Sequence, residues 1–302
     1  MDRALLITNA DAGTNDRESV DLALAELGAS LDVEVAATQS LGDLDEALAA
    51  KDGRLVVVAG GDGSLHAVIA SLHRRGELAD TRLGLVPLGT GNDFARALRI
   101  PLDPAGAAAV VTSGRESPLD LLVDDDDHVV VNAVHIGVGV DAAREAERWK
   151  RRLGKLGYPV GAAMAGFKGA RGHRLSVIAD GHVITGGSRR TLQVGIGNGA
   201  FIGGGTPLIP DADPGDGQAD LMLSFAATRT QRLLYVVHLK LGTHGERHNV
   251  QILRATRIDV SGRGFSYNAD GELSARTRKR TWQLRPAAYT MRLPTPEQAA
   301  PT

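Results

Sequence analysis

Short apolar runs alternate with helical patterns over the first third of the chain. Four runs rich in Leu, Ile and Val have the length of strands: residues 3–10, 31–38, 54–60 and 82–88. Between them, apolar residues recur at helical spacing in residues 17–28, 42–51 and 64–76. Nearly continuous apolar strands that alternate with helices predict a parallel sheet covered by helices on both faces.

The pattern changes after residue 120. Six runs read as strands separated by turns: residues 128–139, 173–181, 189–199, 218–226, 249–262 and 280–294. This succession predicts an antiparallel sandwich or barrel, interrupted by one helix at about 141–170. We expect the acidic run DDDD (124–127) to form a solvated hairpin turn in which its charge has no role. We expect the tail PTPEQAAPT (294–302) to be disordered.

Together these patterns predict two domains of different class. The first is an α/β domain with a parallel sheet, formed by residues 1–120 and rejoined by residues 288–302. The second is an antiparallel β-sandwich formed by residues 121–287. A chain of 302 residues is long enough for both.

Composition narrows the class of protein. Hydrophobic residues make up 43% and charged residues 23%, which is ordinary for a soluble globular protein. The net charge of −2 provides no basic field that would indicate a nucleic-acid partner. The chain has no cysteine, which excludes disulfides, thiolate metal sites and thiol catalysis. The N-terminus lacks a signal-peptide layout and no apolar run approaches the roughly 18 residues of a membrane span, so we expect a cytoplasmic protein.

Glycine is over-represented, at 37 of 302 residues, or about 12% against a usual level of about 7%. GGDGS (60–64) follows an apolar strand and opens a helix, and PLGTGNDFAR (87–96) follows the next strand. Both fall at the carboxyl ends of the predicted strands, where α/β sheets bind ligands. Exposed backbone N–H groups at a helix start form an anion site, so we interpret GGDGS as a phosphate loop, with a simple tight turn as the alternative.

Other phosphate and metal signatures are absent. The chain contains no G-x-x-x-x-G-K-[ST] and no strict G-x-G-x-x-G. HGERH (244–248) places two histidines four residues apart, but it is not H-E-x-x-H and no third zinc ligand is apparent.

Four segments together resemble one family. GGDGS (60–64), PLGTGNDFAR (87–96), GGGTPLIPDADPGDGQADL (203–221) and NADGE (268–272) resemble the diacylglycerol kinase catalytic family, which includes bacterial lipid kinases and the sphingosine and ceramide kinases. GGDG alone is shared with NAD kinases, whereas GGDGS followed by PLGTGNDFAR and then LDL is far more specific. The resemblance runs from about residue 3 to residue 294, essentially the whole chain.

The resemblance implies an active site in the cleft between the domains and transfer of the ATP γ-phosphate to a lipid hydroxyl, with Mg²⁺. It implies Asp270 as the base that accepts the hydroxyl proton, with Glu272 close by. Asp62, Asp93 and Asp120 match acidic positions of a network with magnesium and water. The expected nucleotide contacts are Asn9, Thr38, Gly60, Gly61, Asp62, Gly63, Ser64, Gly89, Thr90 and Asn92. A structural magnesium is expected in the loop 211–218, held by Asp216 through its carboxylate and by Asp213 and Gln218 through backbone oxygens.

Three departures from the family pattern affect this interpretation. Ser64 replaces the usual threonine, TNADAGT (8–14) lacks the usual proline and serine, and Ala67 stands where many relatives carry glutamate. Two other functions stay open: phosphorylation of a soluble nucleotide, as in NAD kinases, and nucleotide or lipid binding without catalysis. Diacylglycerol is the default acceptor, with sphingoid and isoprenoid alcohols among the alternatives.

A basic segment offers a route to the lipid. Residues 144–174 carry nine Lys or Arg and two Glu, with Trp149 and Leu153 interspersed. This composition makes the segment a candidate for peripheral contact with the anionic inner face of a membrane. The slightly favoured interpretation is a solvated helix that packs its apolar side on the sandwich.

Overall fold

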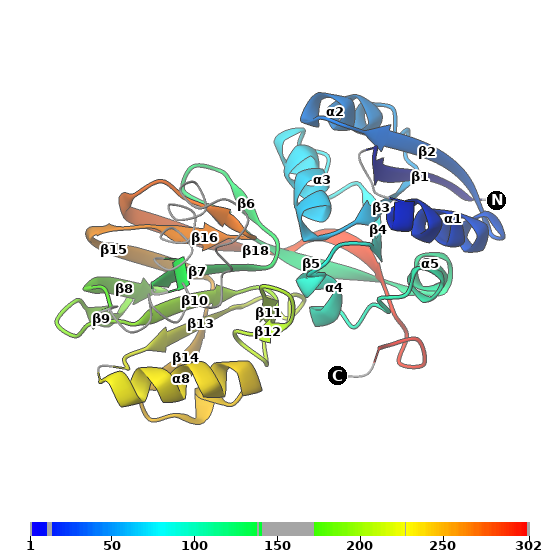
Figure 1. The fold of residues 1–302 in the computed structure, drawn as a ribbon. Coiled ribbons are helices and arrows are strands. Elements are labelled where there is room, and N and C mark those ends of the chain that lie inside the picture. The colour runs from blue at the N-terminus through cyan, green and yellow to red at the C-terminus, as the bar shows by residue number, and fades with distance from the viewer. Residues whose placement is uncertain (1, 11–13, 138, 141–171, 227, 301–302) are drawn as a thin grey trace, which may run out of the picture.

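Strands and helices alternate through the first part of the chain, as the hydrophobic pattern predicts (Figure 1). The computed structural model describes residues 2–10, 14–137, 139–140, 172–226 and 228–300. Up to Asp124 its elements are β1 (Asp2–Asn9), α1 (Thr14–Gly28), β2 (Leu31–Thr38), α2 (Leu41–Ala49), β3 (Leu55–Gly60), α3 (Asp62–Arg74), β4 (Arg82–Pro87), α4 (Asp93–Ala97), α5 (Pro104–Ser113) and β5 (Arg115–Asp124).

Short strands make up most of the described remainder. They are β6 (Val129–Val130), β7 (Ala133–Gly137), β8 (Leu175–Ala179), β9 (His182–Gly186), β10 (Gln193–Gly197), β11 (Phe201–Ile202), β12 (Thr206–Pro207), β13 (Ala219–Ser224), β14 (Val250–Ala255), β15 (Arg257–Phe265), β16 (Tyr267–Ala269), β17 (Glu272–Leu273) and β18 (Thr277–Leu293). The predicted strand 128–139 is in fact two strands, β6 and β7, which belong to different sheets.

The second part contains a helix that the sequence interpretation missed, α8 (Arg229–Leu241). A capping box starts it: the Thr228 hydroxyl accepts from the amide of Gln231, whose side chain accepts from the amide of Thr228. Gly242, with φ at 72°, ends it in the left-handed conformation. The expected single helix at 141–170 lies outside the described residues, as does most of the basic segment 144–174.

One sheet runs through both parts of the molecule. Strands β2, β1, β3 and β4 are parallel neighbours, and the C-terminal end of β18 adds to β4 in the same direction. Strand β5 pairs antiparallel with β18 over residues 282–293, which include this C-terminal end. The first part of β18, residues 277–283, pairs antiparallel with β15, and β8 and β9 follow. On the parallel half, α1 packs against α5 and α2 packs against α3 (Figure 1).

The strand β18 is irregular where it leaves the parallel half. Its register against β5 shifts between Arg285 and Tyr289, and Ala287 has a φ of 49°. We propose that this irregularity marks the division of the chain into residues 1–120 with 288–302, and residues 121–287.

A second, antiparallel sheet completes the sandwich. Its order is β14-β13-β10-β7-β16-β17. The core between the two sheets joins Trp282 and Val177 of the first sheet to Val194 and Leu221 of the second. On the other face of the second sheet, Tyr235 of α8 packs with Met222. The predicted α/β domain and antiparallel sandwich are therefore both confirmed. No helix in the described part of the chain is long and apolar enough to cross a membrane.

The C-terminal tail was wrongly expected to be disordered. The side chain of Gln298 donates to the Ser113 hydroxyl at 2.9 Å, and the amide of Ala300 donates to the carbonyl of Arg99 at 2.9 Å. These bonds hold residues 294–300 against the end of α5 and the turn after α4.

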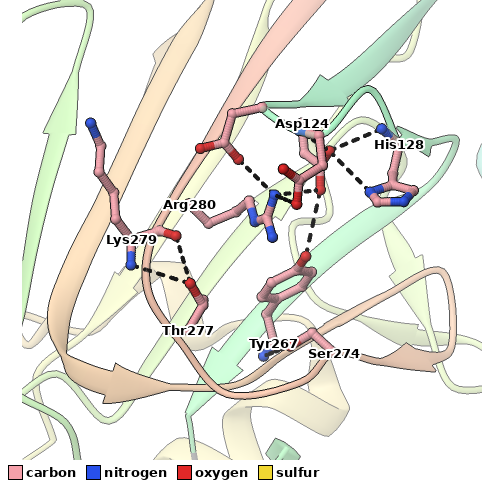
Figure 2. A network of polar contacts seen from close by, with 9 residues as sticks. Asp124, His128, Tyr267, Ser274, Thr277, Lys279 and Arg280 are labelled. Atoms are coloured by element: carbon pink, nitrogen blue, oxygen red, sulfur yellow. Dashed lines mark hydrogen bonds and ion pairs between the residues drawn. The ribbon is translucent and has the colours of Figure 1, made fainter.

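The acidic run 124–127 does form a turn, but its charge has a role that the sequence interpretation did not expect (Figure 2). Asp124 is 8% exposed and lies 3.4 Å from the Arg280 guanidinium, which also contacts Asp125 at 2.8 Å and Asp126. The Tyr267 hydroxyl reaches the Asp124 carboxylate at 3.5 Å. The run therefore forms a cluster of carboxylates around one cation.

We expect Arg280→Met to destabilise the protein, because it leaves the buried Asp124 carboxylate without its counter-ion. The expected loss in free energy of unfolding is about 1–3 kcal/mol, measured by urea denaturation. Arg278→Met is the matched control on the same strand, since Arg278 is exposed. Equal losses in both variants would contradict the role given to Arg280.

Candidate active site

A cavity of about 480 Å³ lies between the parallel half and the sandwich. We call it the central cavity. Its walls come from the start of α3, the loop before α4, the strand β7, the loop after β11 and the β16–β17 turn. The lining residues are Asp62, Leu65, Thr90, Gly91, Asp93, Phe94, Val131, Asn132, Ala133, His135, Ile202, Gly203, Gly204, Asn268, Asp270 and Gly271.

Two of the predicted aspartates tie the walls of this cavity together. The Asp62 carboxylate accepts from the amides of Asp93 and Phe94, each at 3.0 Å, and so caps the start of α4. The Asp93 carboxylate in turn accepts from the amide of Gly204 at 3.0–3.1 Å and from that of Gly205 at 2.6 Å. These hydrogen bonds connect the loop 60–64 to α4, and α4 to the glycine loop 203–205 of the sandwich.

Asp270 lies on the opposite wall, in a two-residue hairpin turn between β16 and β17. Its φ is 48° and that of Gly271 is 94°, so the Asp-Gly turn and the site residue coincide. One carboxylate oxygen accepts from the amides of Asn132 and Ala133 at 2.9 and 3.1 Å. The other accepts from the amide of Val131 at 2.6 Å and contacts Nδ1 of His66 at 2.9 Å. All four lone-pair positions of the carboxylate are occupied.

His66 is a site residue that the sequence interpretation missed. It stands on the first turns of α3, two residues after GGDGS, and meets Asp270 from the other side of the cavity. The hydrogen bond to Asp270 raises the pKa of His66 above its usual value; burial opposes this, and the charges of Asp270 and Glu272 add to it. The ionised carboxylate has no proton to give, so Nδ1 of His66 is the donor.

Close contacts within the loop 60–64, and between it and the loop before α4, require glycine at particular positions. A Cβ on Gly89 would lie 2.5 Å from the Cα of Gly61, and a Cβ on Gly60 would lie 2.5 Å from the Ser64 hydroxyl. Asn92, expected to contact nucleotide, instead bonds the backbone of Gly89 with both ends of its amide, at 2.9 and 2.7 Å. Only Gly63 of this group has open space where a side chain would be, which suits close approach by a ligand.

Gly91 leaves room between the two aspartates. A Cβ there would lie 3.1 Å from Oδ2 of Asp62 and 3.7 Å from Oδ2 of Asp93. Two carboxylate oxygens on either side of a bare backbone suit a hard cation such as Mg²⁺, so the residues fit the magnesium that the family resemblance implies.

A second cavity of about 290 Å³ lies over the carboxyl ends of β1, β2 and β3, and we call it the strand-end cavity. It gathers Asn9, Thr38, Gly63 and Ser64 of the expected nucleotide contacts, together with Ala67. The Thr38 hydroxyl donates to the carbonyl of Thr8 at 3.2 Å. Six of the expected nucleotide residues are therefore divided between two cavities on either side of the start of α3, with Asp62 and Thr90 in the central one. Gly60, Gly61, Gly89 and Asn92 line neither cavity.

Two expected catalytic residues do not line the central cavity. Glu272 is exposed, beyond the turn that carries Asp270. Asp120 is 2% exposed, and its carboxylate accepts from the amides of Gly217 and Ala287 at 2.7 and 2.8 Å. Asp120 is thus bound to the expected metal loop and to the bend in β18, and it is separate from Asp62, Asp93 and Asp270.

The expected metal loop brings its residues together. The amide of Gln218 donates to Asp216 at 3.0 Å, and that of Gly215 donates to Asp213 at 3.0 Å. Asp220, which was not expected here, has a buried carboxylate oxygen with no hydrogen-bond partner among the described residues. Burial raises the pKa of Asp220 to about 6, with Arg254 opposing and Asp216 adding to the rise.

A cation fits this excess of carboxylates, although Arg254 already lies 3.2 Å from Asp216. Over the described ranges no three His, Cys, Asp or Glu side chains are grouped for a metal. A magnesium site here therefore depends on backbone oxygens, as the sequence interpretation requires.

Comparison with known proteins decides the family. Residues 3–123 match the family described as "Diacylglycerol kinase catalytic domain", and residues 132–292 match that described as "YegS C-terminal NAD kinase beta sandwich-like domain". A protein of Yersinia enterocolitica named "Probable lipid kinase YegS-like" is 33% identical over 286 residues, which cover 90% of each chain. The chain belongs to the diacylglycerol kinase catalytic-domain family. The predicted family is confirmed.

Further relatives agree with this assignment. A protein of the same name from Klebsiella pneumoniae is 31% identical and covers 96% of each chain. A crystal structure of a diacylglycerol kinase from Bacillus anthracis superposes with a TM-score of 0.73 at 20% identity, over 99% of this chain and 98% of that one. At that identity the likeness is one of fold.

Two features of the central cavity were not named as site residues from the sequence. One is the glycine run 203–205, in which three successive glycines with positive φ form the loop that binds Asp93. His135 lies inside an apolar strand, where a histidine in a core is the ordinary interpretation. Burial lowers the pKa of His135 to about 4, so this cavity residue is a neutral imidazole at physiological pH.

The pH dependence of stability tests the contact between His66 and Asp270. Because the folded-state pKa of His66 is raised, its contribution is complete below the unfolded-state value of about 6.5 and is lost as pH rises through the folded-state value. We expect wild type to lose more stability than His66→Asn as pH rises above about 6.5. Imidazole NMR titration should show the raised pKa and its fall in Asp270→Asn. A His66 pKa that is the same in both proteins would rule the contact out.

Proposed function

We propose that this protein is an ATP- and Mg²⁺-dependent lipid kinase that converts diacylglycerol to phosphatidic acid. The observation that carries the proposal is that Asp62, Asp93 and Asp270 all line one cavity. The names of the relatives, "Probable lipid kinase YegS-like", support a lipid acceptor. The product would enter phospholipid biosynthesis at the cytoplasmic face of the membrane.

The two cavities suggest how the substrates are arranged. The strand-end cavity offers hydroxyls and amide groups of Asn9, Thr38 and Ser64, which suit the nucleoside end of ATP. The open space at Gly63 and the start of α3 favour the phosphates, since a helix N-terminus carries partial positive charge. The acceptor lipid would then enter the central cavity, with its hydroxyl toward Asp270.

The reaction needs positioning and charge neutralisation more than covalent help. The lipid oxygen forms a bond to the γ-phosphorus as the bond from phosphorus to the bridging oxygen breaks, and ADP leaves. The hydroxyl proton passes to Asp270. Of the four donors to that carboxylate, His66 alone is a side chain, so we propose that its hydrogen bond opens to free the lone pair that accepts the proton. Asp62 and Asp93 would hold magnesium, whose positive charge would offset the charge on the transferred phosphoryl group.

Asp270→Asn tests the base. The amide keeps the shape but cannot accept the proton, so we expect kcat to fall about 10²- to 10⁴-fold with ATP and diacylglycerol in mixed micelles. Glu272→Gln is the control, because Glu272 is exposed outside the cavity, and we expect a change of about twofold or less. Equal activity of wild type and Asp270→Asn would remove Asp270 from the base role. Sphingosine, ceramide, monoacylglycerol and NAD as acceptors test the specificity, and label on NAD alone would favour an NAD kinase.

Thermal unfolding with and without Mg²⁺ tests the structural metal. We expect Mg²⁺ to raise the Tm of wild type by binding the folded state, and Asp216→Asn to reduce this rise because one ligand carboxylate is lost while the site at Asp62 and Asp93 remains. Asp213→Asn should keep the rise, since only the backbone oxygen of Asp213 is expected to bind. Identical Mg²⁺ responses in wild type and Asp216→Asn would exclude Asp216 as a ligand.

A further inference from the structure

Helix α8 exposes large apolar side chains along one side. Leu233 is 63% exposed, Leu234 40%, Val237 48% and Leu241 68%. Their spacing of one, four and eight residues from Leu233 places them on one face of the helix. The opposite side is fixed to the sandwich by Tyr235, which is fully buried and reaches Gln193 at 3.2 Å through its hydroxyl. We call these four residues the α8 apolar face.

Single exposed apolar residues are normal, but a cluster of them marks an interaction surface. The α8 apolar face accounts for four of the ten large hydrophobic side chains that are exposed in the described ranges. The helix therefore has two apolar sides: one packs on the sheet, and the other is exposed.

The charge of helix α8 indicates the kind of surface that it would bind. Between Arg229 and Leu241 it contains Arg229, Arg232 and Lys240, and no Asp or Glu. Nothing in this segment opposes contact with an anionic surface. Apolar side chains beside Lys and Arg on one helix are typical of helices that lie in the plane of an anionic membrane interface, where both kinds of residue contribute to binding.

The position of α8 connects it to the central cavity. The β11–β12 hairpin lies between α8 and α4, and it contacts both helices (Figure 1). Ile202, Gly203 and Gly204 of this hairpin line the cavity. At its other end, Pro207 approaches the C-terminal end of α8, since a Cβ on Gly242 would lie 3.3 Å from its ring. A surface bound to α8 would lie beside the same hairpin that forms the cavity wall.

We propose that the α8 apolar face, with Arg229 and Lys240, docks the protein on an anionic lipid surface. This proposal rests on the proposed function in that the acceptor is taken to be a membrane lipid. It gives the lipid-docking role, for which residues 144–174 were the candidate in the sequence, to a helix far along the chain. The four side chains would enter the headgroup region while the arginine and lysine contact anionic headgroups.

Vesicle co-sedimentation tests the proposal, with phosphatidylcholine vesicles that contain or lack phosphatidylglycerol. We expect Leu233→Ser/Val237→Ser/Leu241→Ser to weaken binding to the anionic vesicles by about tenfold or more. Arg229→Gln/Lys240→Gln should weaken it by about tenfold on anionic vesicles only. Leu22→Ser is the matched control, because Leu22 is 53% exposed on another helix, and it should bind as wild type does. Circular dichroism and Tm check that each variant is folded.

Activity and association state separate the remaining outcomes. With a short-chain, water-soluble diacylglycerol the triple variant should turn over as wild type does, whereas with vesicle-borne diacylglycerol it should lose most activity. Wild type that fails to bind anionic vesicles would overturn the docking, even if the short-chain acceptor is phosphorylated. A wild-type dimer that the triple variant dissociates, with vesicle binding unchanged, would overturn it in favour of a second copy. Vesicle binding by wild type without phosphate transfer to either acceptor would overturn the proposed function and still support the docking.

Discussion

The Asp93 carboxylate accepts hydrogen bonds from the amides of Gly204 and Gly205, and through them it fixes the α/β half of the cavity to the sandwich half. The Asp62 carboxylate likewise accepts from the amides of Asp93 and Phe94, which fixes the start of α3 to the start of α4. A buried carboxylate is tolerated only where donors replace its water, and here backbone amides supply them. The geometry of the cavity therefore depends on these bonds as well as on the continuous sheet.

The hydrophobic pattern was sufficient for most of the fold, because buried strands and amphipathic helices differ in period. The strands and helices up to β4 were predicted to within a few residues, whereas α5 and β5 were not among the predicted elements. Helix α8 was missed because the run LLYVV in its middle is apolar on successive positions: one side packs on the sheet and the other is exposed. The long strand β18 was located, but its partners in both halves could not be predicted, since pairing is a property of the whole topology.

For the site, too, some residues could be predicted from the sequence and others could not. Family resemblance identified Asp62, Asp93 and Asp270, whose side chains all line the central cavity. Sequence could not tell that Asp120 supports the metal loop and the bend in β18, because that depends on the amides of Gly217 and Ala287. His66 was missed for a related reason. It is a helix residue whose partner lies in a hairpin turn far along the chain, and no local pattern connects the two.

The start of α3 lies between the two cavities, and this position matters for phosphate transfer. Gly63 opens toward the strand-end cavity, Asp62 and Leu65 face the central cavity, and His66 reaches across to Asp270. The N-terminal amides of a helix favour negative charge at the point where a phosphoryl group would pass from one cavity to the other. The first turns of α3 also contact the proposed base, through the hydrogen bond from His66 to Asp270.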